Sequence, residues 1–110
     1  MLIARRSLRA MDATPISDDT LMALFEAARW TPSHYNTQNW RFVYAKRDTP
    51  HWEAFLDALW DGNKAWAKDA AVLVVAMSKK SYVYNGRVVP LPSHSFEVGS
   101  AWMAMALGKI

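Results

Sequence analysis

The sequence contains no cysteine among its 110 residues. This absence excludes disulfide bonds, thiol nucleophiles and metal sites built on thiolates. It suits a reducing compartment, and the first residues lack the apolar run of a secretory signal, so we expect a cytoplasmic protein. No apolar stretch approaches the ~20 residues that a membrane-spanning helix needs, and we therefore expect no membrane partner.

A large excess of positive or negative charge is also absent. The 13 Lys and Arg residues against 10 Asp and Glu residues give a net charge of only +3. Since there is also no lysine-rich tail and no recognisable nucleic-acid motif, we expect a small anionic ligand rather than a nucleic acid. The three histidines share no metal-ligand spacing, so we expect no metal site.

Large apolar side chains are abundant by contrast. Hydrophobic residues make up 52 % of the chain, with six Trp and six Met. A chain of this length can bury one core but scarcely two. With no repeat and no low-complexity segment, the sequence predicts a single domain over residues 1–110.

Two helices and a strand are predicted in the first half. Ser17, followed by two aspartates, is typical of a helix start, because the hydroxyl caps the helix and the acids favour its positive end. Pro32 ends this helix, and residues 41–45 predict a strand. Thr49 and Pro50 open a second helix, which Gly62 closes. The apolar stripes of these two helices are Leu21, Leu24, Phe25 and Ala28, and Trp52, Phe55, Leu56, Leu59 and Trp60.

The second half predicts strands and a third helix. The continuous apolar run at 70–77 predicts a strand buried on both faces. The Asn-Gly pair within "SYVYNGRVVP", residues 81–90, is compatible with a hairpin or with a flap loop. A helix then begins at Ser93 or Ser95, and we expect Val98, Trp102, Met105 and Ala106 to face inward. So few strands do not complete a sheet for three helices, so we expect partner chains or a longer protein of which this is the N-terminal part.

The stretch "RRSLR", residues 5–9, places three arginines beside a hydroxyl. One interpretation is structural: exposed basic residues next to a helix-capping serine. The other is an anion site, because guanidinium groups form bidentate, charge-assisted hydrogen bonds with phosphate. Arg5, Ser7 and Arg9 alternate, so an extended or first-turn backbone would point them toward one anion.

The stretch "TPSHYNTQNWRF", residues 31–42, is the second unusual segment. Taken alone, it is most simply a polar loop rich in turn formers. Its amides and hydroxyls offer both donors and acceptors, however, and they also suit the edge of a heteroaromatic ring.

The two stretches, in this order and about 25 residues apart, together resemble the nitroreductase family of FMN-dependent oxidoreductases. "NKAWAKDAAVLVVAMS" and "SHSFEVGSAWMAMAL" are similar to the family's central strand and core helix, so the resemblance covers nearly all of the chain. It implies an α+β fold of the nitroreductase type, with a mixed sheet flanked by helices and truncated at its C-terminus. It also implies a homodimer with FMN at the subunit interface.

The resemblance implies a set of cofactor-binding residues and no catalytic acid or base. The first stretch would bind the FMN phosphate, with Arg6 as the arginine that faces solvent or a carboxylate such as Asp12. The second would contact the flavin ring of the partner subunit, and Asn63 its pyrimidine edge, although a plain turn residue is an equal interpretation there. The cofactor-binding residues are Arg5, Arg6, Ser7, Arg9, Pro32, Ser33, His34, Asn36, Gln38 and Asn63.

The resemblance further implies a function and leaves two alternatives open. The function is two-electron transfer from NADH or NADPH, through FMN, to a nitroaromatic, a quinone or a similar planar acceptor. One alternative is a truncated, inactive fragment that still dimerises, and the other is a small domain that binds anions or nucleic acid. Asn39 stands where the family commonly has proline, a departure that leaves the rigidity of the loop open.

Overall fold

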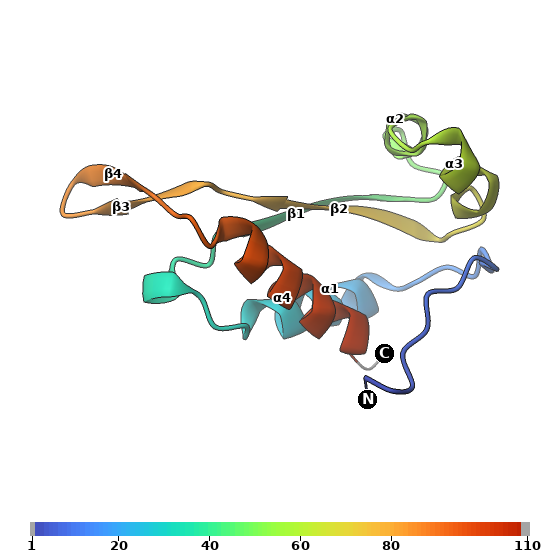
Figure 1. Ribbon diagram of the computed structural model, residues 1–110. Helices are drawn as coiled ribbons and strands as arrows, with labels where there is room; N and C mark the ends of the chain where they lie inside the picture. Colours follow the sequence, from blue (N-terminus) through green and yellow to red (C-terminus); the bar gives the residue numbers. More distant parts are fainter. Residues whose placement is uncertain (1, 109–110) are drawn as a thin grey trace.

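The fold is built around a ribbon of two long antiparallel strands (Figure 1), in a computed structural model that describes residues 2–108. Strand β1 (Trp40–Lys46) pairs with β2 (Val72–Ser78), in a register that places Trp40 opposite Ser78 and Lys46 opposite Val72. Helices α1 (Asp18–Arg29) and α4 (His94–Leu107) lie against one face of this ribbon. The α+β class predicted from the sequence is confirmed.

The two ends of the ribbon carry different additions (Figure 1). Helices α2 (Trp52–Asp57) and α3 (Asp61–Ala67) connect β1 to β2 at one end. At the other end β3 (Ser81–Tyr84) and β4 (Arg87–Pro90) form a separate antiparallel hairpin. Every strand pair within residues 2–108 is antiparallel, so the parallel pairs of the expected mixed sheet do not lie in this part of the chain.

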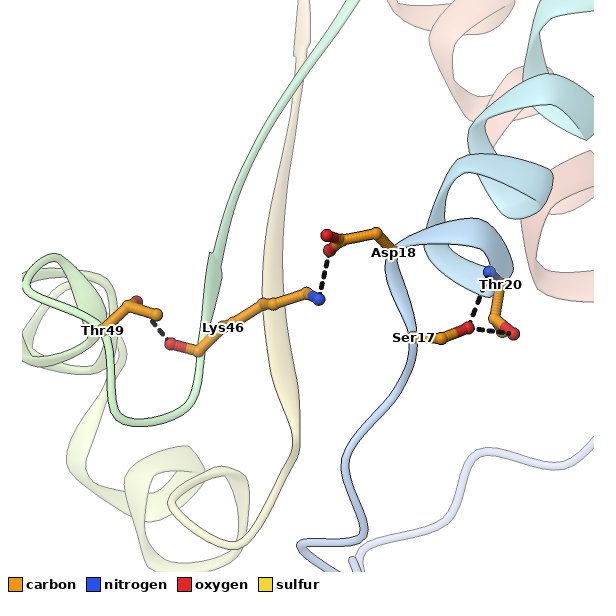
Figure 2. Close-up of polar contacts among 5 residues, drawn as sticks. All are labelled: Ser17, Asp18, Thr20, Lys46 and Thr49. Atoms are coloured by element: carbon orange, nitrogen blue, oxygen red, sulfur yellow. Dashed lines mark hydrogen bonds and ion pairs between the residues drawn. The ribbon is translucent and has the colours of Figure 1, made fainter.

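Helix α1 begins as its sequence predicts. The Oγ atom of Ser17 accepts a hydrogen bond of 3.1 Å from the backbone N–H of Thr20, and two aspartates occupy the first turn. One of them, Asp18, forms an ion pair with Lys46 at the end of β1 (Figure 2). The Thr49 hydroxyl donates to the backbone carbonyl of Lys46. Lys46 therefore joins the start of α1, through Asp18, to the turn that follows β1.

The core lies where α1 and α4 meet β1. Ala28, Trp40, Val98 and Ala101 form a buried cluster, and Phe42 and Met105 pack against it. The ring of Phe25 stacks on that of Phe42 at 5.5 Å between centroids. The prediction that Trp102 and Ala106 face inward is wrong, because both are exposed.

The second helix was expected to run from residue 49 to Gly62, and this prediction is wrong. The chain forms two short helices because Trp60 has an extended backbone, at φ −63° and ψ 145°, and precedes the first residue of α3. Gly62 lies inside α3 instead of ending a helix. A Cβ atom there would fall 2.1 Å from the Trp60 ring, so glycine permits that ring to fold over the helix.

Strand β2 is not buried on both faces, contrary to the expectation from its apolar run. Val74, Val75 and Met77 are 37–43 % exposed. The physical reason is that β2 has one strand neighbour only, and that α1 and α4 cover a single face of the ribbon. A broad apolar surface of the ribbon therefore faces outward in this chain.

The hairpin interpretation of residues 81–90 is confirmed. Asn85 and Gly86 both have positive φ, 50° and 73°, as a two-residue hairpin turn of type I′ requires. Helix α4 follows with Ser93 as its N-cap residue, the earlier of the two predicted starts. None of the helices formed by residues 2–108 is both long enough and apolar enough to cross a bilayer.

Candidate cofactor-binding site

The loop of residues 31–39, between α1 and β1, has an unusual backbone. It contains a short 3₁₀ turn, η1 (His34–Asn36), and three of its residues have positive φ: Tyr35 at 50°, Asn36 at 52° and Gln38 at 46°. For residues other than glycine such a conformation costs about 1–3 kcal/mol each, with asparagine the most tolerant. Contacts with other parts of the chain must therefore hold the loop in shape.

Two elements distant in sequence supply those contacts, and both act on His34. The buried carboxylate of Glu97, in the first turn of α4, accepts a hydrogen bond from the backbone N–H of His34. The hydroxyl of Tyr82, in β3, lies 3.3 Å from Nε2 of the same residue. Within the loop, the Ser33 Oγ atom accepts a hydrogen bond of 3.0 Å from the N–H of Gln38.

Asn39 closes the loop and is almost completely buried, with 1 % of its surface exposed. Its Nδ2 atom donates to the carbonyls of His94, at 3.2 Å, and Lys79, at 3.4 Å. Its own carbonyl accepts a bond of 2.8 Å from the N–H of Lys79. Asparagine in place of proline therefore ties the loop to other elements, because its side chain joins the loop to the starts of the hairpin and of α4.

Two amide side chains of the loop are paired with each other. Gln38 Nε2 donates to Asn36 Oδ1 at 3.0 Å. This bond fixes the orientation of the Asn36 amide and leaves both hydrogens of its Nδ2 atom to donate outward. Asn36 is exposed, whereas Gln38 is half-buried and supports it.

Four buried polar atoms among the described residues lack a hydrogen-bond partner, and all four belong to residues that line cavities beside this loop. Thr31 and Glu97 line a cavity of about 540 Å³ between the loop and α4, together with Pro32, Ser33 and His34. Thr37 and Asn39 line a second cavity, of about 500 Å³, on the hairpin side. The four unpartnered atoms themselves are closed off from solvent, so the cavities are defined by the residues and not by these atoms.

The arginine-rich stretch at residues 5–9 is built differently. It has no helix or strand, and the helix-cap interpretation of its serine is wrong, because α1 begins only after Ser17. Arg5 Nη1 donates to Ser7 Oγ at 3.0 Å, so these two side chains do share one side of the chain, as their alternation predicts. Ser7 and Arg9 are exposed, and Arg5 is half-buried.

Arg6 turns back on its own backbone. Its Nη1 atom donates to the carbonyls of Ile3, at 2.6 Å, and Arg5, at 2.9 Å. Of the two alternatives for Arg6, solvent and a carboxylate such as Asp12, the structure has the first: Arg6 is exposed, and the Asp12 carboxylate accepts hydrogen bonds from the side chain and the backbone of Thr14. These bonds lower the pKa of Asp12 below its ordinary value.

The two predicted stretches lie at opposite ends of the molecule. The N-terminal segment runs past the end of the ribbon that carries α3, whereas η1 lies toward the end that carries the hairpin (Figure 1). Asn63 is an exposed residue of helix α3 and not the turn residue of the structural interpretation. One chain therefore brings Pro32, Ser33, His34, Asn36 and Gln38 together but does not bring them to Arg5, Ser7 and Arg9.

Sequence reasoning missed three residues of the site. Glu97 was covered only as part of the predicted third helix, Tyr82 only as part of a possible hairpin, and Asn39 only as a departure from a motif. Their partners lie 40 to 63 positions away in the chain. No pattern in one sequence indicates such pairs.

Comparison with known proteins agrees with this architecture. The profile of the Nitroreductase family matches residues 2–107. A nitroreductase-like protein of Streptomyces coelicolor, SCO7141, is 34 % identical over 79 residues, which are 71 % of this chain and 39 % of that protein. A crystal structure of an oxidoreductase containing FMN is 40 % identical, with a TM-score of 0.88 over 92 % of this chain and 52 % of that one.

A more distant crystal structure has the same fold. It is that of a nitroreductase-like protein of Desulfovibrio desulfuricans in complex with FMN, with 23 % identity and a TM-score of 0.78, over 96 % of this chain and 58 % of that one. The chain belongs to the nitroreductase family. It spans about half the length of the relatives named here.

Proposed function

We propose that the protein formed by this chain is an FMN-dependent oxidoreductase that transfers two electrons from NADH or NADPH to a nitroaromatic, a quinone or a similar planar acceptor. Membership of the nitroreductase family supports the class. The observation that carries the proposal is the separation of the two predicted binding stretches at opposite ends of one chain. We propose that the cofactor lies between two copies of the chain and contacts the arginine-rich stretch of one copy and the loop of the other.

The chemistry of the N-terminal stretch fits a phosphate. Arg5 and Ser7 already lie within hydrogen-bond distance of each other, and the serine hydroxyl, which accepts from Arg5, is free to donate its own hydrogen. Arg9 is exposed and adds a second guanidinium. Phosphate oxygens only accept hydrogen bonds at neutral pH, so three donors are the complement that they need. We assign Arg6, which is bonded to its own backbone, a minor role in this contact.

The chemistry of the loop fits the edge of a flavin ring. The edge offers both donors and acceptors, and the outward Nδ2 atom of Asn36 supplies donors to it. Pro32, Ser33 and His34, from the same loop, line the cavity between the loop and α4. We assign Gln38 to orienting Asn36, and Asn63 to the pyrimidine edge.

The protein's own residues would bind and orient the cofactor and exclude water. FMN, when bound, supplies the reversible two-electron redox chemistry, including the acceptance of hydride from a nicotinamide. No side chain of residues 2–108 is assigned as an acid or base in this proposal. We further propose that residues 1–110 form one domain, that the protein acts in the cytoplasm, and that nucleic acid is not a partner.

Reconstitution with FMN tests the proposal. The purified protein is incubated with excess FMN, desalted and examined by visible absorption, and oxidation of NADH and NADPH is then followed with a nitroaromatic and with a quinone. Retained flavin with acceptor-dependent turnover is the expected result. Retained flavin without turnover would favour the inactive, dimerising fragment, and failure to retain FMN at any concentration tested would contradict the proposal.

A further inference from the structure

Three of the four tyrosines of the chain gather where the loop of residues 31–39 meets the hairpin. Tyr82 and Tyr84 are two positions apart on β3, so their side chains lie on the same face of the hairpin. The loop adds Tyr35, whose ring centroid lies 5.8 Å from that of Tyr84 and 6.4 Å from that of Tyr82. The loop and the hairpin therefore share a cluster of phenol rings.

Of the two pairs that Tyr35 forms, the one with Tyr84 is the closer and the more exposed. The planes of the two rings are inclined by 32°, and their separation is within the range of about 4.5–7 Å that aromatic rings in contact adopt. Tyr35 is 73 % exposed and Tyr84 is 51 % exposed, whereas Tyr82 is half-buried. A small oxidant in solvent can therefore reach both rings, and both side chains have room to rotate toward each other.

The backbone beside Tyr35 is held in place. The N–H of His34 donates to the buried carboxylate of Glu97, and the hydroxyl of Tyr82 lies 3.3 Å from Nε2 of the same histidine. The His34 ring packs edge-on against that of Tyr35, at 4.7 Å between centroids. The fold, and not proximity in the sequence, therefore brings Tyr35 to Tyr84.

We propose that Tyr35 and Tyr84 form an oxidation site, at which a one-electron oxidant joins the two rings into dityrosine. Each phenol gives one electron to the oxidant and its hydroxyl proton to water, which leaves a phenoxyl radical on each ring. The radicals couple through one carbon ortho to each oxygen. Each of these carbons then loses its proton while the oxygen beside it gains one, so both phenols are restored. The sum is one new carbon–carbon bond and the loss of two electrons and two protons.

The bond ties the loop of residues 31–39 to β3 within one chain. The hydrogen bonds that hold the loop can open and close, whereas a carbon–carbon bond between two rings is not cleaved by thiols or other mild reductants. Oxidation therefore fixes the loop on the hairpin irreversibly. The inference does not rest on FMN binding, because both tyrosines belong to one chain and the oxidant is a separate molecule.

Oxidation of the purified protein, in dilute solution and without added flavin, tests the proposal. The protein is illuminated briefly with tris(bipyridyl)ruthenium and persulfate and is then digested with trypsin. Mass spectrometry should find the peptide of residues 30–41, in which Tyr35 is the one tyrosine, joined to the peptide of residues 81–87 with the loss of two hydrogen atoms. Because this reaction needs no flavin, its failure and the failure of the FMN proposal are distinguishable. Absence of the joined peptides, or bonds between chains only, overturns the inference.

Variants that replace tyrosine with phenylalanine then locate the bond. Phenylalanine keeps the ring but lacks the hydroxyl, so it forms no phenoxyl radical. Tyr35→Phe and Tyr84→Phe should each lose the joined peptides. Tyr44→Phe is the control and should keep them, since Tyr44 is also exposed, at 40 %, but packs against Phe25 on the ribbon. Joined peptides that persist in Tyr84→Phe would place the bond at Tyr82 and contradict the assignment.

Unfolding tests whether the fold selects this pair of tyrosines. Fragmentation of the joined peptides distinguishes a bond at Tyr84 from a bond at Tyr82, because both tyrosines belong to the peptide of residues 81–87. In concentrated urea the native distances are lost, so the yield should fall and the preference for Tyr84 should disappear. The same yield and the same preference in urea would mean that the native arrangement does not direct the coupling, and the oxidation site would be wrong.

Discussion

The arginine-rich stretch at residues 5–9 and the loop at residues 31–39 differ in how they are held. The hydrogen bonds from side chains of the first stretch reach no further than three positions along the chain. In the loop, the ring of His34 bonds to Tyr82 and its backbone N–H donates to Glu97, 48 and 63 positions away. The loop also keeps three positive φ angles, which the arginine stretch does not need.

This difference separates two ways of binding a ligand. A phosphate is recognised by charge, and long arginine side chains can reach it from a backbone that has few fixed contacts. The edge of a planar ring is recognised by donors and acceptors at fixed positions, which requires a preorganised backbone. Substitutions should therefore damage the loop through its supports, and the arginine stretch only through the ligand-binding side chains themselves.

Removing the support of the loop should have the largest effect. Glu97→Ala deletes the buried carboxylate that accepts a hydrogen bond from the His34 N–H. The substitution leaves this N–H without its partner and creates a cavity. We expect a loss of about 2–4 kcal/mol in the free energy of unfolding, measured in urea. Glu53→Ala, at an exposed acid in the first turn of α2, is the control and should cost far less. Similar losses in the two variants would mean that Glu97 does not hold the loop.

The next largest effect concerns the arginine stretch and appears only with ligand present. Arg9→Ala should weaken FMN binding by about 1.5–3 kcal/mol, the usual contribution of a hydrogen bond to a charged group. Riboflavin, which lacks the phosphate, should bind the variant and the parent alike, and the free energy of unfolding without ligand should stay unchanged. If riboflavin loses as much affinity as FMN, then Arg9 is not a phosphate ligand.

A smaller effect is expected from the exposed amide of the loop. Asn36→Asp keeps the size of the side chain but replaces two donors with a charge, which opposes an electron-rich reduced ring. Turnover should slow, and the flavin reduction potential should fall, by an amount equivalent to about 1 kcal/mol. Affinity for the phosphate end should change little, which competition with inorganic phosphate measures.

Mixing these two variants tests whether each site takes residues from both chains. An Arg9→Ala chain combined with an Asn36→Asp chain should give heterodimers with one undamaged site and one doubly damaged site. Activity of the mixture should then exceed that of either parent. The mixture would show no gain if each chain bound FMN with its own two stretches, and the shared site would be wrong.

The smallest effect is a dependence on pH at the end of α1, directly before the loop. Hydrogen bonds from Arg29 and Trp30 lower the pKa of the Glu26 carboxyl below its ordinary value of 4.5. A group with a lowered folded-state pKa stabilises the fold above its unfolded pKa, and this contribution is lost as pH falls through the folded value. Glu26→Gln should therefore flatten the decline in stability below pH 4.5, slightly, since the carboxylate is exposed. A decline identical to that of the parent would contradict this.

Much of the fold is predictable from local pattern. Ser17 with its two aspartates predicts the start of α1, and Asn85 with Gly86 predicts the hairpin, because each signal depends on neighbours within four residues. The break at Trp60 is not predictable in this way, since its ring folds over Gly62 and replaces the helix stop that a glycine usually indicates. The exposed faces of β2 and Trp102 also depend on which elements cover them, and periodicity does not specify that.

The candidate site, like the fold, is predictable from the sequence only where it depends on neighbouring residues. The residue types at 5–9 and 31–39 indicate their chemistry, and the motifs of the nitroreductase family indicate their roles. The supports from Glu97 and Tyr82 and the buried position of Asn39 depend on contacts across 40 or more residues. The cavity on the hairpin side of the loop likewise requires the fold, because Tyr35, Arg41 and Lys79, which line it, are brought together only in space.

The register of the central ribbon also has a consequence for the order of folding. Its closest pair in sequence is Lys46 opposite Val72, joined through α2 and α3, and its most distant pair is Trp40 opposite Ser78. Closing the shorter loop costs less entropy, so we expect pairing to begin at the α2–α3 end and to proceed toward Trp40. The contact of His34 with α4 requires that end of β1 to be in place. The loop of residues 31–39 should therefore reach its final conformation late, after the ribbon and its helices have formed.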